Sequence, residues 1–161
     1  MVYHDPHPLP PRPDAARILA NYLVNFHTEH TFLDPCRLSD LFSRLYGELS
    51  SGPAQASQRT SKEDLFQANM VLALGSIGLY RSGTLDLDPF GFFTAALETS
   101  PPFGFSFGSV QDIENVLLIA HFGVFYNIGV YYLGYRLVTS LIFCTRLLHM
   151  GAEPRLYQNV H

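Results

Sequence analysis

The last third of the chain, residues 109–151, constrains the fold most, because it is densely apolar and nearly free of chemically reactive side chains. It opens with Ser109-Val-Gln-Asp112, which matches a helix-capping box. Residues 116–135 then contain no Asp, Glu, Lys or Arg. A second apolar stretch, over residues 131–149, carries a leucine stripe at Leu133, Leu137, Leu141 and Leu148. The segment predicts two packed helices, and hence an interaction or regulatory module.

Helix start signals recur along the rest of the chain. Ser61-Lys-Glu-Asp64 is another capping box. Three aspartates stand where they can cap a helix, and the last two precede a proline suited to the first helical position: Asp14, Asp34 and Asp88. No run alternates apolar and polar residues with the period of a strand. The sequence therefore predicts an all-α fold of about six helices in an irregular array.

The pattern of composition divides the chain into three parts. Residues 1–13 are rich in proline and are predicted to form an extended linker. Residues 14–155 are predicted to be one helical domain, with a polar loop at 50–60, and to be incomplete at the C-terminus. Residues 156–161 form a tail.

Charge is scarce in this chain. Apolar residues make up 47% of the 161 residues and charged residues 15%, against roughly 25% in ordinary soluble domains. Either a membrane or another protein surface is expected to cover the apolar excess. The net charge of −4 argues against direct binding of nucleic acid. Two cysteines, Cys36 and Cys144, provide no disulfide framework.

One motif resembles a catalytic one. Gly104-Phe-Ser106-Phe-Gly108 matches the nucleophile elbow of hydrolases, for which His121 or His149 would be the base and Asp112 the orienting acid. The elbow needs a preceding strand, and two prolines stand there instead. We therefore favour a chance match in a loop, and predict that the chain is not an enzyme and has no catalytic residue.

One cluster has residue types that bind metals, namely His27, His30, Asp34 and Cys36. No paired cysteines support a zinc site, and histidines at a helix C-terminus are favoured by the helix dipole alone. We expect no metal or cofactor site here.

The uncharged run at residues 116–135 just reaches the ~20 residues needed to span a bilayer. His121, Asn127 and three glycines suit a lipid-facing helix poorly. A buried helix pair is therefore favoured, and a small membrane-associated helical protein anchored by residues 116–135 remains the alternative.

Three segments occur in an order that is similar to one known family. The first runs from Leu9-Pro-Pro-Arg12 to Phe32-Leu-Asp-Pro35. The second joins residues 69–76 to residues 92–97. The third begins at residues 109–119 and ends with residues 135–138 and 147–154. Over residues 9–155 the chain thus resembles the fungal-specific transcription factor domain, the middle homology region of fungal zinc-cluster regulators.

The resemblance implies a regulatory domain of a nuclear transcription factor that acts through protein contacts or a small-molecule effector of unknown identity. Full-length relatives carry a separate six-cysteine, two-zinc cluster that binds DNA. With two cysteines in all, this chain is predicted to hold no zinc and to reach DNA only through such a separate module. The apolar helix pair at residues 109–149 is expected to contact a protein partner or a second copy of the chain.

Overall fold

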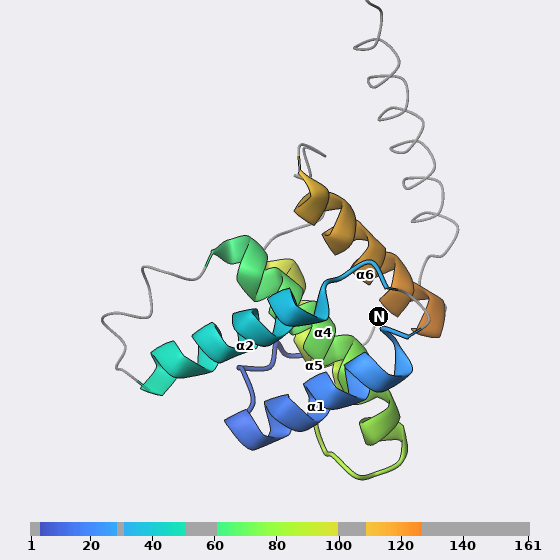
Figure 1. Ribbon diagram of the computed structural model, residues 1–161. Coiled ribbons are helices and arrows are strands. Elements are labelled where there is room, and N and C mark those ends of the chain that lie inside the picture. Colours follow the sequence, from blue (N-terminus) through green and yellow to red (C-terminus); the bar gives the residue numbers. More distant parts are fainter. Residues whose placement is uncertain (1–3, 29–30, 51–60, 100–108, 127–161) are drawn as a thin grey trace, which may run out of the picture.

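The computed structural model describes residues 4–28, 31–50, 61–99 and 109–126, with only the backbone at 48–50 (Figure 1). This part of the chain holds five helices and no strand, which confirms the predicted all-α fold. The helices are α1 (Arg12–Asn25), α2 (Pro35–Ser50), α4 (Lys62–Arg81), α5 (Pro89–Thr99) and α6 (Val110–Tyr126). The further helix predicted over residues 131–149 lies outside the described residues.

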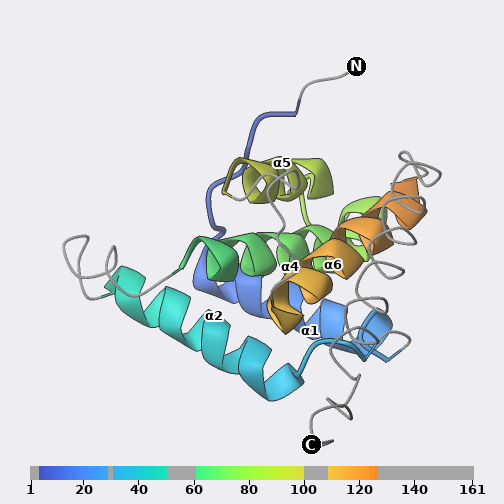
Figure 2. The ribbon, with the colours of Figure 1, turned by 90° about the horizontal axis from the view of Figure 1, so that it is seen from above.

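Helix α4 is the centre of the fold. Its residues from Phe66 to Ile77 are all buried, and none of them is charged. It lies between α5 on one side and α1 and α2 on the other, and α6 crosses beside it (Figure 2). A helix that is apolar on nearly every side is stable only when neighbours cover it all round. The other helices therefore each bury one face against α4.

The contact between α4 and α1 is close because a glycine stands at the crossing. A Cβ at Gly75 would meet the backbone oxygen of Ile18 and would lie 2.8 Å from its Cγ2 atom. The Gly75 carbonyl accepts a hydrogen bond of 2.7 Å from the side-chain amide of Asn21. Ile18 and Tyr22 are buried on α1 at this contact.

Most of the predicted helix starts are confirmed by hydrogen bonds. Asp34 accepts from the N–H of Cys36 at 2.9 Å, and Asp88 accepts from the N–H of Phe90 at 3.1 Å. The hydroxyl of Ser61 accepts from the N–H of Asp64 at 3.0 Å. These bonds satisfy backbone donors that the first helical turn leaves free.

The predicted start at Asp14 was wrong. Helix α1 begins at Arg12, with Pro11 at its N-cap and no side-chain cap. Proline is tolerated in the first turn because no N–H is needed there, so the helix starts within the proline-rich segment. Asp14 lies in the first turn, where its charge suits the positive end of the helix dipole.

Residues 4–11, here called the N-terminal strap, lie extended against the helices. The N–H of His7 donates to the Gly91 carbonyl at 3.0 Å, and His4 Nδ1 lies 2.6 Å from a carboxylate oxygen of Asp88. The hydroxyl of Tyr46 donates to the Pro10 carbonyl at 2.8 Å. The strap thus connects the start of the chain to α5 and α2.

We predict that Gly75→Ala lowers the free energy of unfolding by about 1–3 kcal/mol, because the methyl group forces α1 away from α4. Gly47→Ala is the matched control, since a Cβ there meets nothing within 4 Å on the exposed side of α2. It should raise stability by about 0.4–1 kcal/mol. Urea unfolding of both variants measures the difference, and equal effects would contradict a tight crossing at Gly75.

Alkaline pH tests the burial of Tyr46. Burial, helped by the nearby Asp14 carboxylate, raises the pKa of Tyr46 to about 12. The folded chain holds the proton that an unfolded tyrosine loses near its ordinary pKa of about 10. Stability should therefore be constant below about pH 10 and fall as pH rises toward 12.

We predict that Tyr46→Phe costs about 1 kcal/mol at neutral pH, from loss of the bond to Pro10, and makes the alkaline fall shallower. Tyr80→Phe, at a residue that is 43% exposed, is the control and should leave stability unchanged at neutral pH. The measurement is urea unfolding at several pH values. A fall of undiminished slope in Tyr46→Phe would contradict the prediction.

Candidate interaction surface on helix α6

Helix α6 is apolar on two opposite sides. One side faces the core, where Leu118, Ile119 and Phe122 are buried. The ring of Phe122 stacks on Phe93 of α5 with 4.4 Å between the ring centroids, and it meets Phe90 edge-on at 5.4 Å. This side alone supplies the burial that the helix needs to pack in the fold.

The opposite side carries the outer stripe, defined as Val110, Ile113, Leu117, Ala120 and Val124. At 3.6 residues per turn these five positions fall within about 80° of the helix circumference. Val110 is 71% exposed and Val124 is 63% exposed, while Leu117 and Ala120 are half-buried. The spacing alternates three and four residues, which is the spacing of helices that pack against another helix.

No charged residue lies on the outer stripe. The two acidic residues of α6 both have partners elsewhere, and α6 contains no Lys or Arg. Asp112 accepts from the N–H of Ser109 at 2.9 Å, while the Ser109 hydroxyl accepts from the N–H of Asp112 at 3.1 Å. The predicted capping box is therefore confirmed. Glu114 points inward and is 7% exposed.

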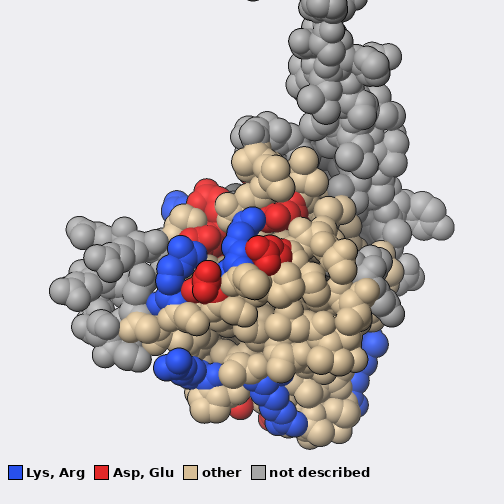
Figure 3. All heavy atoms as spheres, in the orientation of Figure 1, with Lys and Arg blue, Asp and Glu red and all other residues tan. Residues whose placement is uncertain are grey.

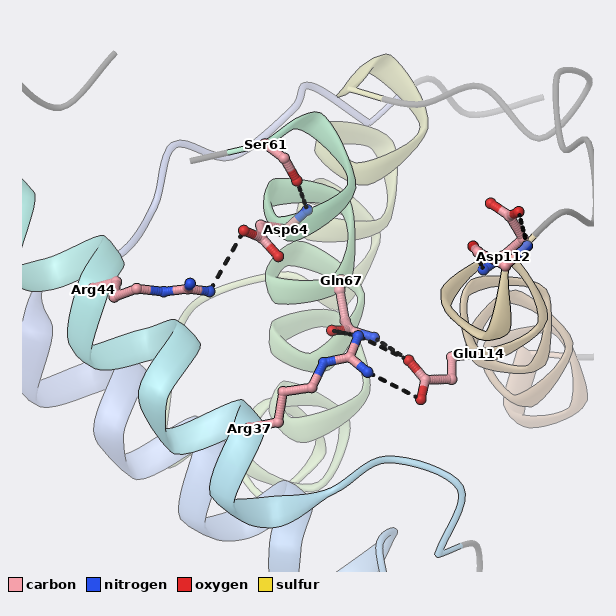
Figure 4. Close-up of polar contacts among 8 residues, drawn as sticks. Arg37, Arg44, Ser61, Asp64, Gln67, Asp112 and Glu114 are labelled. Carbon is pink, nitrogen blue, oxygen red and sulfur yellow. Dashed lines mark hydrogen bonds and ion pairs between the residues drawn. The ribbon is translucent and has the colours of Figure 1, made fainter. Parts of the chain in front are cut away.

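Glu114 joins three helices through a polar cluster in which Glu114 and Gln67 are buried (Figure 4). Its carboxylate lies 3.0 Å from the guanidinium of Arg37 on α2 and accepts from the amide of Gln67 on α4 at 3.2 Å. Arg37 also donates to the Gln67 side-chain oxygen at 3.3 Å. A buried carboxylate needs such partners, so this cluster determines which side of α6 faces inward.

Several charged residues lie together on the face that Figure 3 shows. Basic and acidic side chains lie next to one another over α2 and the start of α4, with a largely uncharged surface around them (Figure 3). Arg44 and Asp64 form one of these pairs, at 3.5 Å and largely exposed. Charge is thus sparse over much of the rest of this face.

The C-terminal end of α6 is held by aromatic contacts. Phe125 is 38% exposed and packs edge-on against Phe26, the C-cap of α1, with 4.9 Å between the ring centroids. The guanidinium of Arg81 lies 5.5 Å from the centre of the Tyr126 ring. Neither contact was predictable from local sequence, because the partners come from distant helices.

A hollow of about 210 Å³ lies between α1 and α2. It is lined mostly by apolar and small residues, namely Arg12, Ala15, Ala16, Leu19, Ser39, Phe42, Ser43 and Tyr46. Pockets for small molecules typically occupy roughly 300–1,000 Å³. The hollow is therefore too small to be a convincing effector site.

Of the hydrolase candidates, the structure describes Asp112 and His121, and it does not bring these two together. Residues 104–108 and His149 lie outside the described part of the chain. Asp112 is engaged in the capping box, and His121 stands nine residues later, about 13 Å along the helix axis. The His121 ring packs against Phe26, with 5.6 Å between the centroids.

The structure describes three of the four candidate metal ligands. Asp34 caps α2, Cys36 is exposed, and His27 is half-buried. His30 lies outside the described residues. Within the described ranges, no three His, Cys, Asp or Glu side chains are grouped as a metal site requires.

The alternative of a membrane anchor concerns residues 116–135, of which the structure describes 116–126. Among the helices described, none combines the length and apolar character needed to cross a bilayer.

Comparison with family models, curated proteins and solved structures gives no match to this chain.

We predict that Arg37→Ala lowers the free energy of unfolding by about 1–2 kcal/mol, because Glu114 stays buried without its cation. The half-exposed position of Arg37 keeps the loss below that of a fully buried pair. Arg44→Ala is the control, since its exposed pair with Asp64 contributes less than about 0.5 kcal/mol. Equal losses in urea unfolding would show that the Glu114 cluster does not hold α6.

Proposed function

We propose that this chain is the regulatory, protein-binding domain of a fungal transcription factor and that it binds its partner through the outer stripe of α6. The observation that carries the proposal is the second apolar side of α6, which no described helix covers. A helix that is apolar all round is normally buried on both sides. The partner is a protein that offers an apolar helix face.

The stripe supplies only part of the energy that a specific contact needs. Covering an exposed valine contributes about 1–2 kcal/mol, so Val110 and Val124 together contribute about 2–4 kcal/mol before the cost of association. A flanking surface with few charges adds little desolvation cost. Since association costs at least about 4 kcal/mol, the proposed contact must also use residues beside these two valines.

The assignment to transcription rests on the resemblance over residues 9–155, and the all-α fold agrees with it. In this proposal the chain acts in the nucleus, has no enzymatic activity, and uses no zinc or other cofactor of its own. Its effect on DNA passes through a separate zinc-cluster module. Protein contacts at α6 then change the activity of that module.

The stripe should also support association of the chain with itself when no partner is present. We predict that Val124→Lys reduces this association at least fivefold, because a charge would have to be desolvated in the contact. Because Val124 is 63% exposed, the fold should be retained. Sedimentation velocity over a range of protein concentrations gives the association constant.

Val24→Lys is the matched control, since Val24 is 67% exposed in the last part of α1 and does not belong to the outer stripe. It should associate as the parent chain does. A parent chain that is monomeric at all concentrations, or equal weakening by both variants, would overturn the proposed role of the stripe.

A further inference from the structure

We propose that the surface beneath the N-terminal strap is a recognition site for an extended, proline-rich segment of another protein, and that the strap occupies this site until such a segment displaces it. The strap site is defined as Asp88, Phe90, Gly91 and Phe92 at the start of α5, and Tyr46 on α2. Because it lies on α5 and α2, its role does not depend on the outer stripe of α6.

The strap touches this site at every third residue as it passes from the start of α1 to α5 (Figure 2). The contacts come from His4, His7 and Pro10. The residue after each of them is exposed, namely Asp5, Pro8 and Pro11. A polyproline II helix has three residues per turn, so each series forms one side of such a helix. The strap therefore docks one side of a polyproline II helix on the protein and turns another toward solvent.

The composition of the strap prepares it for this shape. Each of residues 5–11 is either a proline or stands directly before one. Proline fixes φ near −65°, and the residue before a proline is held in extended conformations. Pro11, with φ −52° and ψ 146°, has the polyproline II conformation. A free segment of this composition already has the docked shape, so its binding costs little conformational entropy.

Two positions of the site select flat rings that can form hydrogen bonds. The imidazole of His4 stacks on Phe90 with 4.8 Å between the ring centroids, and its Nδ1 atom lies 2.6 Å from the Asp88 carboxylate. The ring of His7 lies against the backbone of Gly91, where an added Cβ would collide with it. The carboxylate favours a ring that donates a hydrogen bond or carries positive charge, and the glycine leaves room for a second ring.

The remaining contacts hold the backbone of the segment. The N–H of His7 donates to the Gly91 carbonyl at 3.0 Å, and the Tyr46 hydroxyl donates to the Pro10 carbonyl at 2.8 Å. Within residues 4–11, Pro10 alone is buried. Aromatic side chains that meet an extended proline-rich backbone are a known mode of peptide recognition. The pattern that this site recognises is therefore His-x-x-His-x-x-Pro.

Another protein fits this site better than a second copy of the chain. The docking contacts come from residues 4–10, so a separate segment with the same pattern can replace them. In a second copy, Pro10 is separated from the start of α1 at Arg12 by Pro11 alone. Its strap would have to bring its own α1 against the α1 that already lies beside Tyr46. A free segment carries no such obstacle.

A labelled peptide with the sequence of residues 4–11 tests the site on the full chain. We would weaken the resident strap by His7→Pro, which removes the N–H donor and the ring but keeps the extended backbone. In the parent chain, the tethered strap competes at an effective concentration of the order of millimolar. Fluorescence anisotropy should therefore show at least tenfold tighter binding of the peptide to His7→Pro than to the parent.

Two matched controls locate the binding. The peptide that carries the same His7→Pro change should bind neither chain. Adding Gly91→Ala to the His7→Pro chain should abolish binding of the unchanged peptide, because the new methyl group occupies the place of the ring. Alanine is a better helix former than glycine, so α5 should be retained. Binding that survives Gly91→Ala would overturn the proposal, since the peptide would then lie elsewhere.

His4→Ala is the second variant, in case circular dichroism shows that His7→Pro has lost helix. The His4 side chain is 33% exposed, so its removal should leave the fold intact while it frees Asp88 and Phe90. The peptide should bind this chain at least threefold more tightly than the parent. No gain in binding by either variant would overturn the proposal. A mixed dimer of parent and His7→Pro chains that the peptide dissociates would show that a second copy fills the site, and would overturn the assignment to another protein.

Discussion

The burial of α4 is the constraint on which the rest of the structure depends. Twelve consecutive residues, from Phe66 to Ile77, are buried, so the helix has no side that water can face along that length. Only neighbours on every side can satisfy such a helix. The closeness of α1 follows from Gly75, and the positions of α5 and α6 follow from the remaining apolar sides of α4.

Glu114 determines how α6 is rotated where it packs against the other helices. A carboxylate at 7% exposure is costly unless cationic and amide groups meet it, and Arg37 and Gln67 do so in one rotation of α6. Turning α6 by one residue would separate the carboxylate from both partners. The polar cluster therefore selects the apolar side that packs inward and, by the same geometry, the side that faces outward.

The sequence predicted what is local and missed what is long-range. The capping boxes and the Asp-Pro pairs lie within four residues of the groups they bond, so the starts of α2, α4, α5 and α6 were predictable. The strap was not, because His4 and Asp88 stand 84 positions apart. Nor was the pairing of Arg37 with Glu114, across 77 positions. The outer stripe was visible as apolar sequence, but only packing shows which of its residues the core leaves exposed.

The chain's shortage of charge affects the outward side of α6 in particular. Soluble helices usually keep one side in water with charged residues, and α6 has only Asp112 and Glu114. One caps the helix and the other is buried in the core, so neither lies on the outward side. The same two acids that make α6 start and pack correctly thereby leave its outer side apolar. The proposed protein contact would cover a surface that the internal requirements of the fold leave apolar.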